Sequence, residues 1–278
     1  MCRWLGYFGS PIRLDELVYN PTHSLIEQSR AARLTTHVTN ADGFGLGWYG
    51  SRARPGLYRS VAPAWNDRNL QELCAQIDSP LFLAHIRAST GTPVQETNCH
   101  PFRHERWLFV HNGFIADYAS LRRELLLAVD PGLFDGIEGT TDSELMFFLS
   151  LTFGLDDAPL PALERMAGFV EATGRRHGVE DPLQMTVGVS DGERLYAVRY
   201  ASGGVLANSL YVSNDARDVR LLYPENERLR HMSDEARAVV SEPLADLPGL
   251  WREVPPSSAL VVQSGSYEEL PFTPRPPA

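Results

Sequence analysis

Short apolar runs separated by glycine-rich turns dominate the first part of the chain. Continuous apolar runs of this length are typical of strands in a sheet that is covered on both faces. We therefore predict strands over residues 2–9, 43–50, 80–90 and 106–112.

Apolar residues at helical spacing follow. Leu121, Leu125 and Val129 fall on one face of a helix, and residues 142–153 begin with the acidic first turn that helices prefer. A shorter helical face surrounds Cys74. The main helices are predicted over residues 117–129, 142–153 and 161–176.

Strands then return. The runs over 183–190 and 194–200 are joined by Asp191-Gly192, which is a hairpin signal. Further strands are predicted over residues 210–213, 238–241 and 259–263. The chain thus has strands, then helices, then strands again, and it contains no internal repeat or long linker. This order predicts one α+β domain of two sheets with helices packed outside. We place this domain at residues 2–265 and expect residues 266–278 to form a flexible, proline-rich tail.

Composition narrows the function classes. The chain has 278 residues, 43% hydrophobic content and a formal net charge of −10. An acidic surface repels phosphate backbones, so we expect no nucleic-acid partner. The most apolar stretch, residues 145–155, is too short to span a bilayer, and the N-terminus lacks a signal pattern. We expect a cytoplasmic protein.

The cysteine count, three, is odd and argues against a disulfide framework. Cys74 is interpreted as a small core residue. Cys99 and His100 are neighbours that point to opposite faces of an extended segment, so they do not form a catalytic dyad. The eight histidines do not cluster with cysteines at ligand spacing, so we expect no metal and no other cofactor.

Cys2 is the candidate nucleophile. An initiator Met before a small residue is normally removed, which would leave Cys2 with a free α-amine beside its thiol. Other short stretches offer matching chemistry. Arg87 ends a strand and can hold a carboxylate through two hydrogen bonds. Asn112 and Gly113 form a turn signal, but they can also supply two adjacent N–H donors to an oxyanion. Asp142 is either a helix-start acid or the anchor for an ammonium group.

Read together and in order, six stretches resemble the class II glutamine amidotransferases, which are N-terminal-nucleophile hydrolases. They are MCRWLGY, DGFGLGWY, HIRASTG, NCHPF, HNGF and TTDSE. Two further stretches, HSLIEQS and PAWNDRNL, bring the chain closer to the γ-glutamyl amidohydrolase branch of ergothioneine biosynthesis and yeast glutathione degradation. The resemblance implies a four-layer αββα sandwich, with two mostly antiparallel sheets between helices.

The resemblance also implies a role for each matching residue. Cys2 would attack the γ-carbonyl of a γ-glutamyl group, with its own α-amine as general base. Asn112 and Gly113 would stabilise the oxyanion. Arg87, supported by Thr90, would bind the substrate α-carboxylate, and Asp142 its α-ammonium group. His85, Asn98, His100 and His111 are expected near the site, but the sequence does not decide their roles or that of Cys99.

The chain departs from the family pattern at two positions. Gly91 and Thr92 stand where sugar-synthase members have His-Gly, so one carboxylate contact is in doubt. Cys99 replaces a Thr that many relatives carry, and the sequence does not decide whether it touches the substrate.

Three functions stay open. The first is hydrolysis of a small γ-glutamyl compound, because the amidohydrolase-like region fills almost the whole chain and leaves no room for a synthase domain. The second is a glutaminase subunit that delivers ammonia to a separate synthase or peptidase partner. The third is a degenerate binding protein. The leaving group and any homo-oligomer are not decided by the sequence.

Overall fold

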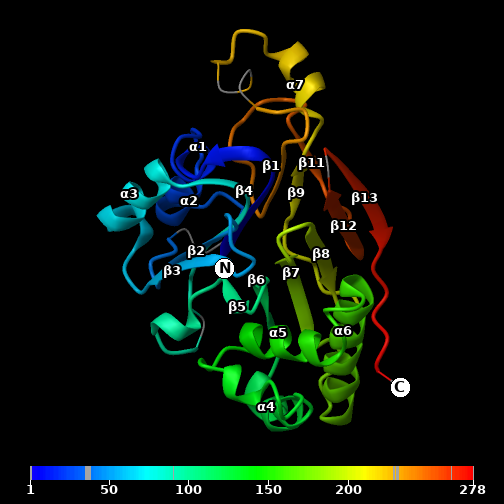
Figure 1. Cartoon of the computed structure of the whole chain (residues 1–278). Helices are drawn as coiled ribbons and strands as arrows, with labels where there is room; N and C mark the ends of the chain where they lie inside the picture. Colours follow the sequence, from blue (N-terminus) through cyan, green and yellow to red (C-terminus); the bar gives the residue numbers. More distant parts are fainter. Residues whose placement is uncertain are drawn as a thin grey trace.

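The structure of the protein, a computed structural model, describes residues 2–34, 39–89, 91–227, 229, 232–263 and 265–277. Two β-sheets lie against each other at the centre, and helices cover their outer faces (Figure 1).

The first sheet contains, within the described residues, β1 (Arg3–Arg13), β2 (Phe44–Trp48), β3 (Gly56–Ser60), β4 (Asp78–Ile86), β9 (Tyr211–Ser213), β10 (Arg237–Val240) and β11 (Trp251–Glu253). Their order across the sheet is β11-β9-β10-β1-β4-β2-β3, and neighbouring strands are antiparallel. The N-terminal strand β1 therefore lies in the middle of the sheet, between β10 and β4, and Cys2 directly precedes it.

The second sheet contains, in the same described part of the chain, β5 (Phe102–His104), β6 (Trp107–Ile115), β7 (Leu183–Ser190), β8 (Leu195–Ala201), β12 (Ser258–Gln263) and β13 (Ser266–Pro271). Its order is β13-β12-β8-β7-β6-β5, again antiparallel throughout.

The helices among the described residues are α1 (Asp15–Val18), α2 (Leu25–Ala31), α3 (Arg68–Gln76), α4 (Tyr118–Leu127), α5 (Asp142–Thr152), α6 (Pro159–Arg176) and α7 (Ala216–Leu222). Short 3-10 turns occur at Ala64–Asn66, Glu96–Asn98 and Phe134–Gly136.

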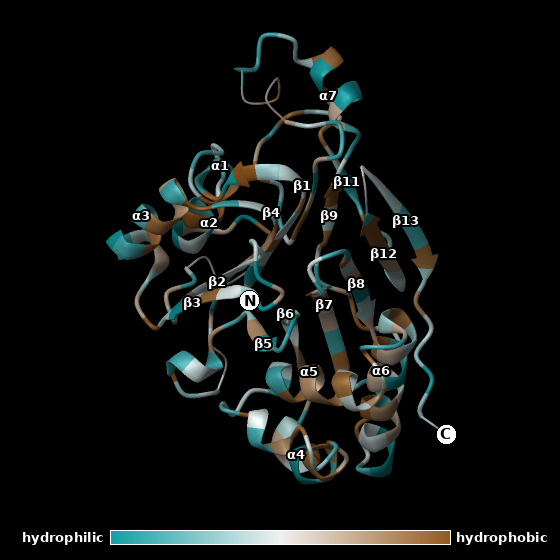
Figure 2. Ribbon diagram, in the orientation of Figure 1, coloured by the Kyte–Doolittle hydropathy of each residue, from teal (hydrophilic) through white to brown (hydrophobic). Residues whose placement is uncertain are grey.

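Among the described residues, most buried apolar side chains form three layers, and a small fourth cluster contains Val219 of α7, Leu229 and Leu250. In β1, Leu5 and Tyr7 face the layer shared with α1, α2 and α3, whereas Trp4 faces the second sheet. This alternation is what a strand between two covered faces requires. A third layer joins the second sheet to α4, α5 and α6. Figure 2 shows hydrophobic colouring along β12 and α5, which belong to these layers. These three apolar layers lie between four successive layers of secondary structure, which are helix, sheet, sheet and helix.

The fold brings the expected site stretches together at one edge of the sheets. Arg3 pairs with Ile86 and Trp4 pairs with His85, so Cys2 lies beside the end of β4. The indole N–H of Trp4 donates to the Thr186 hydroxyl across the inter-sheet space at 3.0 Å. Since Thr186 pairs with Asn112 in the neighbouring strand, β6 faces the start of β1.

These observations confirm the expected α+β class with two antiparallel sheets between helices. Two expectations need correction. Residues 111–114 lie inside β6, where they pair with β7, and do not form a turn after a strand. The chain also continues past residue 265 as the edge strand β13, so the expected domain end divides a hairpin.

Candidate active site

Cys2 lies immediately before β1 and is half-buried. Its Sγ is 3.4 Å from the backbone nitrogen of Ala88, which donates to it, and 3.6 Å from the Ala88 carbonyl oxygen. Burial raises the pKa of the Cys2 thiol, while the Ala88 N–H and the positive charges of Arg87 and Arg3 oppose this rise. The thiol therefore needs a base before it can act as a nucleophile.

Arg87 follows β4 directly and is buried. Its Nη2 donates to the hydroxyls of Thr92 at 2.7 Å and Ser89 at 3.2 Å, and to the Pro93 carbonyl at 3.2 Å. Its Nη1 donates to the Asp42 carbonyl at 3.3 Å. These partners are all neutral oxygens. Within the described residues no carboxylate lies at ion-pair distance from Arg87, so its charge is available to an anion.

Asp142 is the first residue of α5. Its Oδ2 accepts from the Ile115 backbone N–H at 2.8 Å and its Oδ1 accepts from the Ser143 N–H at 2.8 Å. The helix cap is the preceding residue, Thr141, whose hydroxyl accepts from the Glu144 N–H. No cationic side chain of the described chain pairs with Asp142, which leaves its negative charge open to a ligand.

Asn112 is buried in β6, and its side chain makes no hydrogen bond to any of the described residues; the fully buried atom without a partner is the oxygen, Oδ1. Buried amide oxygens are nearly always bonded, so a donor group of a ligand would satisfy this one. The next residue has to be glycine, because a Cβ at Gly113 would lie 1.9 Å from the Gln184 carbonyl oxygen.

One cavity of about 80 Å³ joins these groups. Cys2, Arg87, Asn112, Gly113 and Asp142 all line it. A guanidinium and a carboxylate thus flank a thiol and an unbonded amide, an arrangement that can hold the two charges of an α-amino acid beside a nucleophile. Thr90, the remaining residue expected at the site, lies outside the described residues.

The profile of the class II glutamine amidotransferases matches residues 19–277 of the chain. The chain belongs to the class II glutamine amidotransferase family.

Three relatives place the chain within this family. The yeast protein named "Probable glutamine amidotransferase DUG3", from Saccharomyces cerevisiae, is 33% identical over 95% of this chain and 82% of its own length. The gamma-glutamyl-hercynylcysteine sulfoxide hydrolase of Mycolicibacterium smegmatis is 29% identical over 76% of this chain and 88% of its own length. A solved glutamine aminotransferase class-II domain protein from Silicibacter pomeroyi is 32% identical, with a TM-score of 0.74 over 99% of this chain and all of that one. These relatives confirm the resemblance to the γ-glutamyl amidohydrolase branch.

The fold extends to more distant amidotransferases. The glutamine phosphoribosylpyrophosphate amidotransferase of B. subtilis covers 98% of this chain with a TM-score of 0.62 at 14% identity, and the match takes up 49% of that chain. At this identity the likeness shows the fold alone.

A cluster of three buried histidines lies beside the cavity of this protein. The rings of His85 and His100 stack with centroids 4.1 Å apart, and His85 Nε2 lies 3.1 Å from the His111 carbonyl oxygen. Burial lowers the pKa of His85 to about 3 and lowers those of His100 and His111. His111 Nδ1 lies 2.8 Å from the Ser143 hydroxyl. All three rings are therefore neutral near pH 7, and only His100 and His111 line the cavity.

The structure gives Asn98 and Cys99 supporting positions. The Asn98 amide bonds to the Pro93 carbonyl at 3.0 Å and to the Thr140 N–H at 2.8 Å, joining the loop after β4 to the start of α5. The Cys99 thiol donates to the Ser60 carbonyl and is absent from the cavity lining. Burial raises its pKa to about 11.

Sequence reasoning missed several residues that complete the cavity: Ser89, Thr92, Phe114, Thr141, Ser143 and Gln184. The sequence did mark Thr92, because it stands where the chain departs from the synthase pattern. In the structure it makes the shortest hydrogen bond to Arg87. Gln184 gave no signal, since it reaches the site only through the pairing of β6 with β7.

Two further features of the described residues bear on function. A larger cavity, about 600 Å³, lies between α1 and the segment that contains β11, but none of the expected site residues lines it. No helix in the described ranges has the length and apolar run needed to cross a bilayer, and no group of three or more metal-ligating side chains is found there.

Proposed function

We propose that this protein hydrolyses the γ-glutamyl amide bond of a small γ-glutamyl compound, with Cys2 as the nucleophile. The observation that carries this proposal is the common cavity, in which Arg87 and Asp142 flank the Cys2 thiol and the unbonded Asn112 amide. The names of the yeast and mycobacterial relatives support the same class of substrate.

The glutamyl end would be held by charge. Arg87, fixed by the Thr92 and Ser89 hydroxyls, would bind the α-carboxylate by charge, through the N–H donors that these bonds leave free. Asp142, fixed by two backbone N–H groups, would bind the α-ammonium group. Thr90 is proposed to support Arg87. With both charges held, the γ-carbonyl would reach the thiol in one orientation.

The chemical step would use the α-amine of Cys2 after Met1 is removed. The amine takes the thiol proton, directly or through water, as the sulfur attacks the γ-carbon and a C–S bond forms. The carbonyl electron pair moves to oxygen, where the Asn112 amide and the Gly113 N–H would stabilise the oxyanion. The C–N bond then breaks, and the departing nitrogen takes the proton from the amine. Water hydrolyses the γ-glutamyl thioester and releases glutamate, restoring the thiol.

A second function uses the same residues. A glutaminase subunit would release ammonia for a separate synthase or peptidase partner. The 30% identity to the glutamine–fructose-6-phosphate aminotransferase of Mesorhizobium japonicum, over 63% of this chain and 26% of that protein, favours this alternative. Weak turnover that rises on adding a partner distinguishes it from simple hydrolysis.

The test is glutamate release from glutamine, glutathione, a γ-glutamyl amine and a γ-glutamyl thioether-histidine compound. The protein is first shown by intact mass to lack Met1. Cys2→Ala is expected to abolish release, and Cys99→Ala, which changes a thiol outside the cavity, is expected to retain it. Fast release from a non-glutamine substrate supports hydrolysis, and slow release from glutamine alone supports the subunit function. Unchanged release by Cys2→Ala would contradict both.

A further inference from the structure

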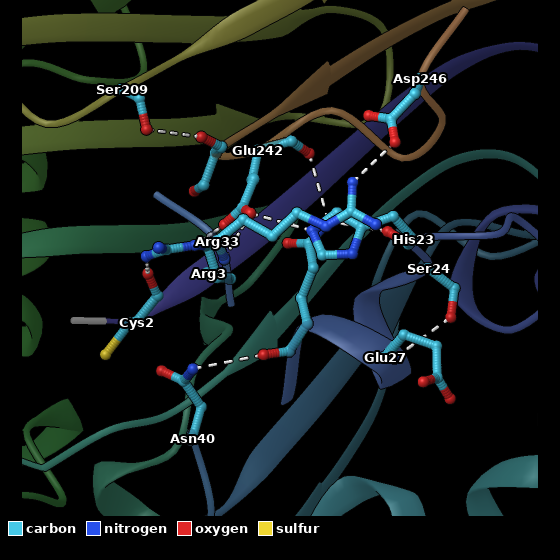
Figure 3. A network of polar contacts seen from close by, with 12 residues as sticks. Cys2, Arg3, His23, Ser24, Glu27, Arg33, Asn40, Ser209, Glu242 and Asp246 are labelled. Atoms are coloured by element: carbon cyan, nitrogen blue, oxygen red, sulfur yellow. Dashed lines mark hydrogen bonds and ion pairs between the residues drawn. The ribbon is translucent and has the colours of Figure 1, made fainter. Parts of the chain in front are cut away.

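A buried ion pair lies directly behind the nucleophile. Arg3, the first residue of β1, and Glu242 have side chains that are each only 2% exposed, and Arg3 Nε donates to Glu242 Oε2 at 2.8 Å. Arg3 Nη1 donates to the carbonyl oxygen of Cys2, also at 2.8 Å. Figure 3 shows Arg3 between Cys2 and Glu242, with the Cys2 sulfur pointing away from this network.

Glu242 is itself fixed from several directions. Its Oε1 accepts from the backbone N–H of Arg33 at 2.7 Å and lies 2.9 Å from His23 Nε2. The Gln28 amide donates to its carbonyl oxygen at 3.2 Å. The hydrogen bonds from His23 and Arg3 lower the pKa of Glu242 to about 2 against the opposing effect of burial. Glu242 is therefore an ionised and immobile partner for Arg3.

Stability alone does not account for a buried pair of this kind. The cost of removing two charges from water often exceeds their mutual attraction, so apolar replacements of similar volume are frequently as stable. The contact with Cys2 O suggests another reason. Cys2 precedes β1 and takes no part in the strand pairing, so rotation about its Cα–C bond would move the amine and the thiol together. The charged hydrogen bond from Arg3 fixes the carbonyl and thereby restricts this rotation.

We propose that Arg3, held by Glu242, is a positioning residue that orients Cys2 toward the cavity, an inference that rests on the proposed function. It keeps the sulfur against the Ala88 N–H, 3.4 Å away, and on the same side as Asn112 and Gly113. The network reaches from the nucleophile to the start of α2 through His23 and to the loop after α2 through Arg33. Both segments lie outside the cavity lining.

The test compares Arg3→Lys with Arg237→Lys. Lysine keeps the charge but cannot bond to Glu242 and to the Cys2 carbonyl in the same fork geometry. Arg237 is a matched control, since it is buried, begins β10, the neighbour of β1, pairs with Asp215 and donates to the carbonyl of Ala236, the residue before it. For Arg3→Lys we expect kcat to fall about 10-fold to 100-fold with KM nearly unchanged. For Arg237→Lys we expect a comparable loss of thermal stability with wild-type kcat.

A second readout does not need the substrate. The rate at which iodoacetamide alkylates Cys2, followed by peptide mass, is expected to fall several-fold in Arg3→Lys because the sulfur loses its contact with Ala88. If wild-type protein releases no glutamate, the proposed function fails while this rate still tests the positioning. If Arg3→Lys does not fold, Glu242→Gln replaces it and should lower kcat at constant KM. The inference would be overturned if a folded Arg3→Lys variant kept the wild-type kcat and the wild-type alkylation rate. It would also be overturned if Arg237→Lys lost as much kcat as Arg3→Lys.

Discussion

Arg87 and Asp142 place opposite charges on the same cavity from different parts of the chain, one at the end of β4 and the other at the start of α5. Neither charge is neutralised by a described side chain. We therefore expect these two residues to select substrates that carry both an α-carboxylate and an α-ammonium group, because a charge-assisted hydrogen bond contributes about 1.5–3 kcal/mol.

Asp142→Asn tests this selectivity. We expect kcat/KM for glutamine to fall about 10-fold to 100-fold, since the ammonium group loses its charged acceptor. The des-amino analogue of glutamine, which lacks that ammonium group, should react equally slowly with both proteins. The measurement is glutamate or glutarate release from the two substrates. An equal loss for both substrates would show that Asp142 acts only through its bonds to Ile115 and Ser143.

Much of the site at this scale was visible in the sequence. Cys2, Arg87, Asn112, Gly113 and Asp142 carry distinctive chemistry in ordered motifs, and the structure places them on one cavity. Their roles in the reaction stay predictions. The contacts of Ser89 and Thr92 with Arg87 were not predicted, although Thr92 stands where the chain departs from the family pattern, because serine and threonine in a loop look alike whether they face solvent or a guanidinium.

At the scale of elements, the close contact between β6 and β7 is what fixes the expected oxyanion site. The space above Gly113 is filled by the Gln184 carbonyl oxygen of the paired strand and by His111 Nε2. A side chain at this position would therefore have to separate the two strands or tilt β6 away from β1.

Gly113→Ala is expected to remove nearly all activity and to destabilise the protein by about 1–3 kcal/mol, the usual cost of overpacking. Gly50→Ala is the matched control, because a Cβ there meets nothing within 4 Å. Urea unfolding and glutamate release measure the two effects. Full activity in Gly113→Ala would mean that β6 can shift without disturbing catalysis, contrary to this view of the site.

The elements that the sequence predicted best are those buried on both faces. β7 and β8 are almost completely buried, and their apolar runs gave their positions to within a residue. The edge strand β13 was taken for part of a tail because most of its residues are exposed, so its sequence lacks the apolar run of an internal strand. The strand β3 was missed for a related reason, since each of its residues is only half-buried.

At the scale of the whole molecule, the layered architecture follows from where the apolar residues lie, but its polar interior could not be foreseen. Histidines from β4, β6 and the segment before β5 meet only after the two sheets pack. The same packing closes Glu242 over Arg3, residues 239 positions apart in the chain. Sequence spacing contains no information about such contacts, which depend on the inter-sheet geometry.

This buried histidine cluster should make the folded protein sensitive to mild acid. The pKa of His85 is lowered from 6.5 to about 3, so below pH 6.5 the unfolded chain binds a proton that the folded protein does not. Stability contributed by neutral His85 is complete above pH 6.5 and is lost as the pH falls toward 3. At pH 5 the loss from this residue is about 2 kcal/mol. The stability that ionised Glu242 contributes is lost at lower pH, between its ordinary pKa of 4.5 and its lowered pKa of about 2, so the effects of the two residues fall in different pH ranges.

Urea unfolding between pH 7.5 and 4.5 measures this dependence. In His85→Gln the stability at pH 7.5 should be lower than in the wild type, because the stacked ring and its bond to the His111 carbonyl are lost, but the decline between pH 6.5 and 4.5 should be shallower. His104→Gln, outside the cluster, should keep the wild-type slope. Parallel slopes in all three proteins would show that His85 accepts a proton in the folded state, and the neutral cluster would then not be a source of acid sensitivity.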